Sequence, residues 1–546
     1  MLDLLLASVE YGGYISIFKL LIFIVLFFCW LPLVSWIHHD SKALETKGET
    51  WTIVILSAGI AGIIIWLFVP VFIVGLLIFV ITVGATSLAY VKFRNSRVLE
   101  FDRVLTIDHL KNLFVSKEKK LEELQSFAFI TANKNEVPIP EPRTPDFLGY
   151  KTAFEILKDA LWRRASNIAF SPTAQDYQVA YNIDGTIEKQ PSLPNDQIEY
   201  FINFIKHLAD LDTNEKRKPQ KGTFLIHEKK NKNDSIWEVT TAGSTAGEQV
   251  RIKQITQEDP IRIGDLGLMP EQFELLNGFN KRKQGLFVIS GPEKSGLTTT
   301  LYALIRNHDA FMNNINTLEK QPSEPIPNIS QNVYSLSDTG TTTYAKKLLS
   351  IVRMGPDVVG ISDCEDADTA RIACAAAQDG KIVYLIIKAD SVIQALGKLL
   401  KFVGDRNTVA KSLMGISNQR IVRKLCEECK EAYTPEKELF RKFNISPEKT
   451  KALYRAGKFQ YDKRGKPSTC EHCQGTGYYE RTGIFEIVAI NQELAKVIQT
   501  QPVPEIGKQF RRAKMLYLQE QALRKVINGT TTINEMIRVL QKKSQK

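Results

Sequence analysis

Apolar runs of two lengths divide the chain into a membrane part and a soluble part. Residues 15–37 form one apolar run that only Lys19 interrupts, and a second run covers residues 51–91. A helix needs about 20 residues to cross the hydrocarbon core of a bilayer. We therefore predict one transmembrane helix over 15–37 and a transmembrane hairpin over 51–91 that turns near Pro70. A single long, kinked helix is the alternative for the second run.

The charges that flank these runs predict their orientation. Residues 1–14 contain Asp3 and Glu10 but no Lys or Arg, whereas basic residues stand between the two runs and directly after the second. Basic residues are enriched on the cytoplasmic side of a membrane. Three spans fit this distribution, with residues 1–14 forming an extracytoplasmic N-terminus. Two spans would place that terminus inside, and three spans leave everything after about residue 92 in the cytoplasm.

The soluble part has the patterning of an α/β protein. Apolar residues at helical spacing among Lys and Glu predict a juxtamembrane helix within residues 92–131, packed on its own domain or on lipid. Four prolines predict a stiff linker over 132–147. Residues 148–258 mix strands and helices and predict an α+β domain. Residues 259–425 alternate apolar strands with helices, which predicts a RecA-like parallel sheet with its ligand site at the carboxyl ends of the strands.

Composition restricts the function classes. The chain has 546 residues, which is enough for several cores, and its formal net charge of +11 is spread thinly along the sequence. Such a diffuse charge is compatible with a surface next to anionic lipid, but it does not by itself argue for a nucleic-acid partner. Seven cysteines are too few for a disulfide scaffold in a chain of this length, and four of them form two C-x-x-C pairs, which suits a reducing compartment.

One segment carries an altered phosphate-binding motif. Residues 291–300 read GPEKSGLTTT, which matches the P-loop pattern G-x-x-x-x-G-K-[ST] except that Leu297 stands at the lysine position. The lysine of a working loop neutralises phosphate oxygens, and the hydroxyl that follows it holds Mg²⁺. Lys294 either folds back over the phosphates or is a solvated loop residue. The candidate nucleotide-binding residues are Gly291, Lys294, Ser295, Gly296, Thr298 and Thr299.

The order of short motifs along the chain resembles a known family. Over roughly residues 148–500 it is similar to the secretion and pilus-assembly ATPases of type II secretion and type IV pilus systems. The resemblance rests on residues 164–168, 182–185, 291–302, 356–359, 419–423 and the cysteine pairs. It implies a hexameric motor on the bacterial inner (cytoplasmic) membrane that binds ATP and Mg²⁺ between its α+β and RecA-like domains. An inner-membrane platform protein is the implied partner.

The chain departs from this family at its acidic motifs. The resemblance places the family's Asp box at residues 317–321, where Glu319 keeps the water-activating acid but Lys320 replaces its acidic neighbour. In the Walker B segment, Asp363 stands in place of a glutamate and Glu365 in place of an arginine. The resemblance therefore makes Glu319 and Asp363 the candidate catalytic residues of a degenerate site.

The family's cationic motifs are also changed. Lys381 and Lys388 stand where the family has histidines, and Asn182, Thr223 and Gln249 stand where it presents arginines to the triphosphate. Phosphoryl transfer depends on positioning and charge stabilisation, and a single arginine finger is worth roughly 10³ to 10⁵ in rate. Together these changes should leave hydrolysis negligible, and they put ATP and Mg²⁺ in doubt as cofactors.

The four paired cysteines predict a metal site. Residues 426–473 begin and end with C-x-x-C pairs, as in the family's tetracysteine element, and four thiolates complete the tetrahedral sphere of a structural Zn²⁺. A redox role is the alternative. The ligands are Cys426, Cys429, Cys470 and Cys473. Residues 474–546 are predicted to form a C-terminal helical region.

Two functions remain to be distinguished. The first is a membrane-anchored pseudoenzyme that acts as a scaffold or regulatory subunit in a homo- or hetero-hexamer, together with a platform protein or an active paralogous ATPase. The alternative is a slow, still ATP-binding hexameric motor that uses Glu319, Asp363 and Thr298 with Mg²⁺. A membrane-anchored nucleic-acid-binding zinc protein is a third, disfavoured reading, because basic and aromatic residues are not concentrated near the cysteines.

Overall fold

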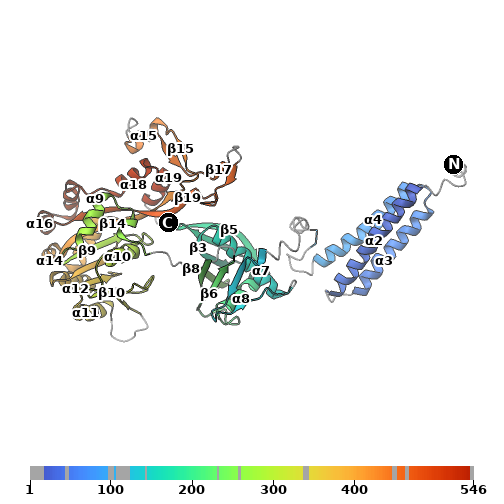
Figure 1. Cartoon of the computed structure of the whole chain (residues 1–546), viewed down its shortest axis with the longest axis horizontal. Coiled ribbons are helices and arrows are strands. Elements are labelled where there is room, and N and C mark those ends of the chain that lie inside the picture. The colour runs from blue at the N-terminus through green and yellow to red at the C-terminus, as the bar shows by residue number, and fades with distance from the viewer. Residues whose placement is uncertain are drawn as a thin grey trace. The chain divides into compact units, whose positions relative to one another are not determined.

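A computed structural model describes most of the chain. The described residues are 17–43, 48–95, 104–105, 123–141, 144–229, 233–255, 260–335, 343–445, 450, 452–461 and 467–541. The chain divides into two compact units, one of residues 1–128 with 228–232 and one of residues 129–227 with 233–546 (Figure 1).

Three long apolar helices dominate the first unit. They are α2 (Ile17–Ala43), α3 (Gly48–Phe68) and α4 (Phe72–Asn95), and each is long and apolar enough to cross a membrane. The segment 51–91 is a helical hairpin that turns between Phe68 and Phe72, rather than one kinked helix. Helix α2 continues six residues past the predicted end of the first run at residue 37.

Close packing and one ion pair hold these helices together. If Gly59 carried a Cβ atom, that atom would lie 2.2 Å from the Trp30 ring, which is closer than van der Waals contact permits. Helix α3 can therefore approach α2 this closely only with glycine at this position. Near the carboxyl ends of α2 and α4, the Arg94 guanidinium contacts the Asp40 carboxylate at 2.8 Å and the Tyr90 hydroxyl donates to it at 2.7 Å. Arg94 is buried, so this pair fixes the register of the two helices.

The α+β domain is built on an eight-stranded sheet with the order β2-β1-β6-β7-β8-β3-β4-β5. Helices α7 and α8 pack together, and edge-to-face contacts join Phe129 of β1, Tyr150 of α7 and Phe204 of α8. The elements are β1 (Phe127–Ile130), β2 (Glu136–Val137), α7 (Pro145–Trp162), β3 (Ala165–Pro172), β4 (Asp176–Ile183), β5 (Thr186–Pro194), α8 (Asn195–Leu208), β6 (Gln220–Glu228), β7 (Asn233–Ser244) and β8 (Gly247–Ile255).

The predicted juxtamembrane helix and linker need correction. Residues 127–130, which were assigned to the end of the helix, form β1, and the predicted linker contains β2, which pairs antiparallel with β1. Helix α7 begins at Pro145, where the ring suits the first helical position and the Thr144 hydroxyl accepts a hydrogen bond from the Phe147 amide at 3.2 Å. Most of the predicted helix, residues 106–122, lies outside the described residues.

A seven-stranded sheet forms the RecA-like part, with the order β11-β10-β12-β13-β9-β14-β19. All neighbouring strands are parallel except β14 and β19. The elements are η2 (Ile263–Leu266), α9 (Pro270–Phe279), β9 (Gly285–Gly291), α10 (Leu297–Arg306), β10 (Ile315–Glu319), β11 (Ser330–Val333), α11 (Tyr344–Arg353), β12 (Val358–Ile361), α12 (Ala367–Gln378), β13 (Ile382–Lys388), α13 (Val392–Val403), α14 (Arg406–Ser412), β14 (Leu413–Leu425) and β19 (Tyr478–Ala489). Strands β9, β10 and β12 are buried along their whole length, as expected when helices cover both faces.

The predicted helical region 474–546 begins with a strand. Strand β19 pairs with β14, so the RecA-like sheet resumes after the cysteine-containing segment instead of ending at residue 425. That segment holds β15 (Glu431–Tyr433), α15 (Lys437–Phe443), β16 (Leu453–Arg455), β17 (Phe459–Tyr461) and β18 (Pro467–Thr469). The helices after β19 are α16 (Gln492–Thr500), α17 (Val503–Arg512), α18 (Leu518–Ile527) and α19 (Ile533–Leu540). The first two join the core of the sheet, and the last two form a separate core with α15.

Candidate functional site

The phosphate-binding loop keeps the strand–loop–helix geometry of its motif. Strand β9 ends at Gly291 and α10 begins at Leu297. Gly296 precedes the helix with φ 81°, a left-handed conformation that favours glycine. The Ser295 hydroxyl donates to the Pro292 carbonyl at 2.7 Å, and the Gln419 amide donates to the Ser295 carbonyl at 2.9 Å. These contacts hold the loop in shape by bonds within the protein.

Leu297 turns its side chain toward the protein. It packs against the core that α9 and α10 form with the sheet, and its Cδ2 would lie 3.2 Å from a Cβ atom if Gly291 carried one. Thr298 and Thr299 are half-buried in the first turn of α10, whereas Lys294 is exposed. The lysine position of the motif is therefore filled by a partly buried apolar residue that packs against the core.

The candidate catalytic acid Glu319 is held by protein donors. It ends β10 with only 1% of its surface exposed. Its carboxylate accepts hydrogen bonds from the Tyr302 hydroxyl at 2.5 Å, the Thr317 hydroxyl at 2.7 Å and the Gln331 amide at 3.2 Å. Sequence reasoning identified Glu319 but missed Tyr302 and Gln331, which lie on other elements. Three donors leave this carboxylate little capacity to orient a water molecule.

Substituted positions from separate motifs meet in one network of ion pairs at the carboxyl ends of the strands. The Lys320 ammonium contacts the Asp363 carboxylate at 2.5 Å and that of Glu365 at 3.0 Å. The Lys388 ammonium lies 3.5 Å from the Glu293 carboxylate and 3.7 Å from that of Glu365. We call these five residues the strand-end network. Its two lysines and three carboxylates give it a net charge of −1, which repels a phosphate.

The ion pairs within the strand-end network stabilise the charged forms of their own side chains. The hydrogen bond with Asp363 raises the pKa of Lys320, and the hydrogen bond from Lys320 lowers the pKa of Glu365. Asp363 is 13% exposed and Lys320 is 47% exposed, so water screens this pair only in part. The carboxylate of the candidate catalytic residue Asp363 therefore binds an ammonium group of the same chain.

The four predicted metal ligands form one buried cluster. The sulfur atoms of Cys426, Cys429, Cys470 and Cys473 all lie within 4.8 Å of one another. The Gly477 amide points at the Cys473 sulfur at 3.3 Å, and the His472 ring lies 3.4 Å from the Cys426 sulfur. Four converging thiols with a backbone donor suit a tetrahedral metal such as zinc, because they supply a complete set of soft ligands.

The chain is similar in sequence to proteins of known families. The model of the family described as "Type II/IV secretion system protein" matches residues 150–538, more than half of the chain. The chain belongs to this family. The type IV pilus assembly ATPase PilB of Thermus thermophilus is 28% identical over 433 residues, which cover 79% of this chain and 47% of the relative. The chain thus spans about half the length of that relative.

Further known proteins resemble the chain. The type II secretion system protein E of Pseudomonas aeruginosa is 28% identical over 385 residues, covering 70% of this chain and 74% of the relative. The X-ray structure of the ATPase DotB from Legionella pneumophila has a TM-score of 0.49 and 15% identity, covering 73% of this chain and 96% of that one. Within the matched residues, the chain has a strand–loop–helix segment with Leu297 at the lysine position of the P-loop pattern, and it has two C-x-x-C pairs.

Proposed function

We propose that this chain is a membrane-anchored, non-hydrolysing member of the secretion and pilus-assembly ATPase family that serves as a scaffold or regulatory subunit. The observation that carries the proposal is the 2.5 Å contact between Lys320 and Asp363. In this proposal, the Lys320 ammonium takes the place that Mg²⁺ with its nucleotide has in an active relative.

Three features of the site disfavour hydrolysis independently. Leu297 supplies no cation for the phosphates, Glu319 is held by three donors, and the strand-end network carries a net negative charge. Each feature acts on charge stabilisation or water positioning, the two effects on which phosphoryl transfer depends. Restoring one of them alone should therefore leave turnover negligible.

The three apolar helices support permanent anchoring. We propose that α2, α3 and α4 each span the inner membrane, with residues 1–14 outside and the domains after residue 92 in the cytoplasm. A subunit held in this way needs no separate membrane recruiter. Its proposed partners are an inner-membrane platform protein and an active paralogous ATPase, within a homo- or hetero-hexamer.

Zinc has a structural role in this proposal. Cys426, Cys429, Cys470 and Cys473 would hold one Zn²⁺ in a closed sphere and so fix both ends of the segment between β14 and β19. The metal would supply folding energy to a segment in which each of the two strand pairs joins only three residue pairs.

A slow ATPase is the second candidate, and the intact loop backbone favours it. Gly291, Gly296 and Thr298 keep the cradle and the metal-side hydroxyl, so nucleotide binding without rapid hydrolysis is chemically reasonable. The two candidates differ in turnover, which makes turnover the decisive quantity.

The test is phosphate release by the full chain in lipid nanodiscs with Mg-ATP. We expect no turnover from the wild type or from Leu297→Lys alone, because Lys320 still occupies Asp363. The variant with both Leu297→Lys and Lys320→Asp should bind nucleotide better than either single variant. Mg²⁺-dependent turnover by the wild type above the uncatalysed background would reject the scaffold proposal, because even a slow ATPase must release phosphate. The full chain is needed because truncation near residue 148 removes β1 and β2 from the sheet.

A further inference from the structure

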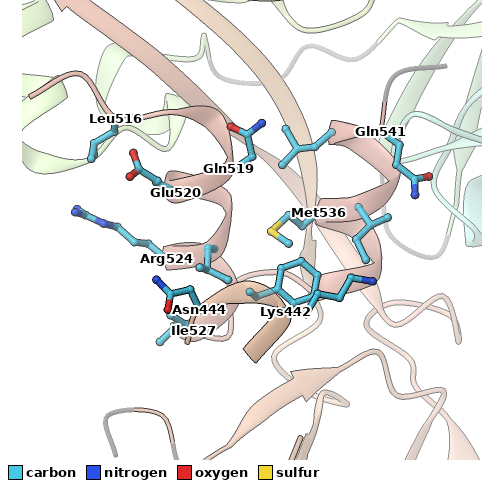
Figure 2. A pocket seen from close by; sticks show the side chains of 13 residues that line it. Lys442, Asn444, Leu516, Gln519, Glu520, Arg524, Ile527, Met536 and Gln541 are labelled. Carbon is cyan, nitrogen blue, oxygen red and sulfur yellow. The ribbon is translucent and has the colours of Figure 1, made fainter. Parts of the chain in front are cut away.

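An apolar groove lies between the last two helices of the described chain. Figure 2 shows α18 and α19 on two sides of the groove, with Met536 between them and Lys442 and Asn444 of the α15 end at its edge. The cavity measures about 730 Å³. Its apolar lining consists of Phe443, Leu516, Leu523, Ile527, Met536, Ile537 and Leu540.

The groove is a separate surface from the strand-end network. Its walls belong to the core that α18 and α19 form with Val422, Phe440 and Ile484, whereas β9, β10, β12 and β13 belong to two other cores. Except for Met536, the apolar lining is only half-buried. Covering these side chains would remove apolar surface from water, which is the main driving force of association.

The rim of the groove has an excess of positive charge. Lys442 and Arg524 line it and are exposed. Glu520 also lines it, but the Arg511 guanidinium on α17 pairs with its carboxylate at 2.5 Å. Past Gln541, which lines the same groove, the sequence continues with three further lysines, Lys542, Lys543 and Lys546. The basic rim therefore repels the basic residues that follow Gln541, whereas it attracts an acidic ligand.

We propose that this groove binds an amphipathic helix of a partner protein that has an apolar stripe flanked by Asp and Glu. Two helices with an apolar trough between them offer the complement of a third helix, whose residues at i, i+3, i+4 and i+7 enter the trough. The walls are helical, so an extended peptide has no strand edge to join there. The acidic flanks of the partner helix meet Lys442 and Arg524.

The test uses the full chain in nanodiscs and two synthetic 18-residue helices as fluorescent probes. Both probes carry the same leucine stripe, and one has glutamate flanks where the other has lysine flanks. We expect the acidic probe to bind at least about tenfold more tightly than the basic probe, with the difference shrinking at high salt. Equal affinity of the two probes, or no binding of the acidic one, would overturn the proposal.

Charge-reversal variants test whether the acidic probe binds at the groove or is attracted by positive charge elsewhere on the protein. The double variant Lys442→Glu with Arg524→Glu changes two exposed side chains and should weaken the acidic probe at least about tenfold. The matched control, Lys437→Glu with Arg512→Glu, reverses two exposed charges outside the groove and should leave binding unchanged. Leu523→Asp should abolish binding of both probes. If the rim variant instead changes the oligomeric state and not probe binding, the groove is an interface between copies of the chain and the proposal is wrong. None of these results depends on nucleotide, so failure here leaves the scaffold proposal intact.

Discussion

Replacing Lys320 by methionine tests whether the strand-end network is a structural unit. Methionine keeps the apolar stem of the side chain and removes the ammonium that contacts Asp363 at 2.5 Å and Glu365 at 3.0 Å. Asp363, which is 13% exposed, is then left without its nearest cation. The carboxyl ends of β10 and β12 lose the charge pair that joins them.

The expected cost follows from the burial of the two partners. Removing one partner of a fully buried pair costs about 3–5 kcal/mol, and exposed pairs contribute about 0–1 kcal/mol. Asp363 is nearly buried and Lys320 is 47% exposed, so we expect Lys320→Met to lower the local stability by about 2 kcal/mol. A double-mutant cycle with Asp363→Asn should assign more than half of that loss to the pair itself.

Hydrogen exchange of the full chain, read by mass spectrometry, measures this loss at the strands concerned. The Ser362 amide donates to the Leu318 carbonyl at 3.1 Å, so peptides that contain Ser362 report the opening of β12 from β10. Lys388→Met is the matched control, because its pairs at 3.5 and 3.7 Å are about half exposed or more and should contribute less than about 0.5 kcal/mol. Equal protection in the wild type and Lys320→Met would refute the reasoning.

Three further predictions concern other sites. Burial lowers the pKa of His308 to about 4 from its ordinary 6.5, so stability is lost as pH falls from 6.5 toward 4. This loss is about 2 kcal/mol at about pH 5, and His308→Gln, which can keep a hydrogen bond to Tyr384, should remove it in chemical denaturation. Burial alone would raise the pKa of Glu535, but hydrogen bonds from two arginines outweigh it and lower the pKa to about 2. Its contribution, on the order of 3 kcal/mol, is present above pH 4.5 and lost as pH falls toward 2, and Glu535→Gln should lose it at neutral pH in the same assay. Cys470→Ser should reduce bound zinc, measured by mass spectrometry of the metal, and should expose residues 426–473 to protease, whereas intact zinc content would contradict the assignment.

The sequence was sufficient where local pattern decides structure. Continuous apolar runs predicted the three long helices, and two spaced glycines predicted the strand–loop–helix of the phosphate-binding motif. The paired cysteines predicted a cluster that the fold brings together within 4.8 Å. In each case, residues close in sequence, or of a type with one dominant use, carry the information.

Local sequence patterns could not predict which strands pair when those strands lie far apart in the sequence. Strand β19 lies more than 50 residues after β14 yet pairs with it, so the region predicted to be helical begins with a strand of the sheet. Strand β1 was misassigned because a four-residue apolar run fits either periodicity. Each charged residue of the strand-end network can be read from the sequence, but the contacts between them depend on the strand order β10-β12-β13-β9. Substitutions in separate sequence motifs can be recognised as one interacting network only when the strand order is known.

Equilibrium binding of Mg-ATP to the full chain, measured by calorimetry in nanodiscs, tests the central claim most directly. If Lys320 takes the place of the metal and its nucleotide, the wild type should show no binding at about 1 mM ATP, and removal of Mg²⁺ should change nothing. Leu297→Lys combined with Lys320→Asp should then gain Mg²⁺-dependent affinity. Wild-type binding with a Kd of about 10 μM that requires Mg²⁺ would contradict the account, because it would mean that the metal displaces the lysine from Asp363.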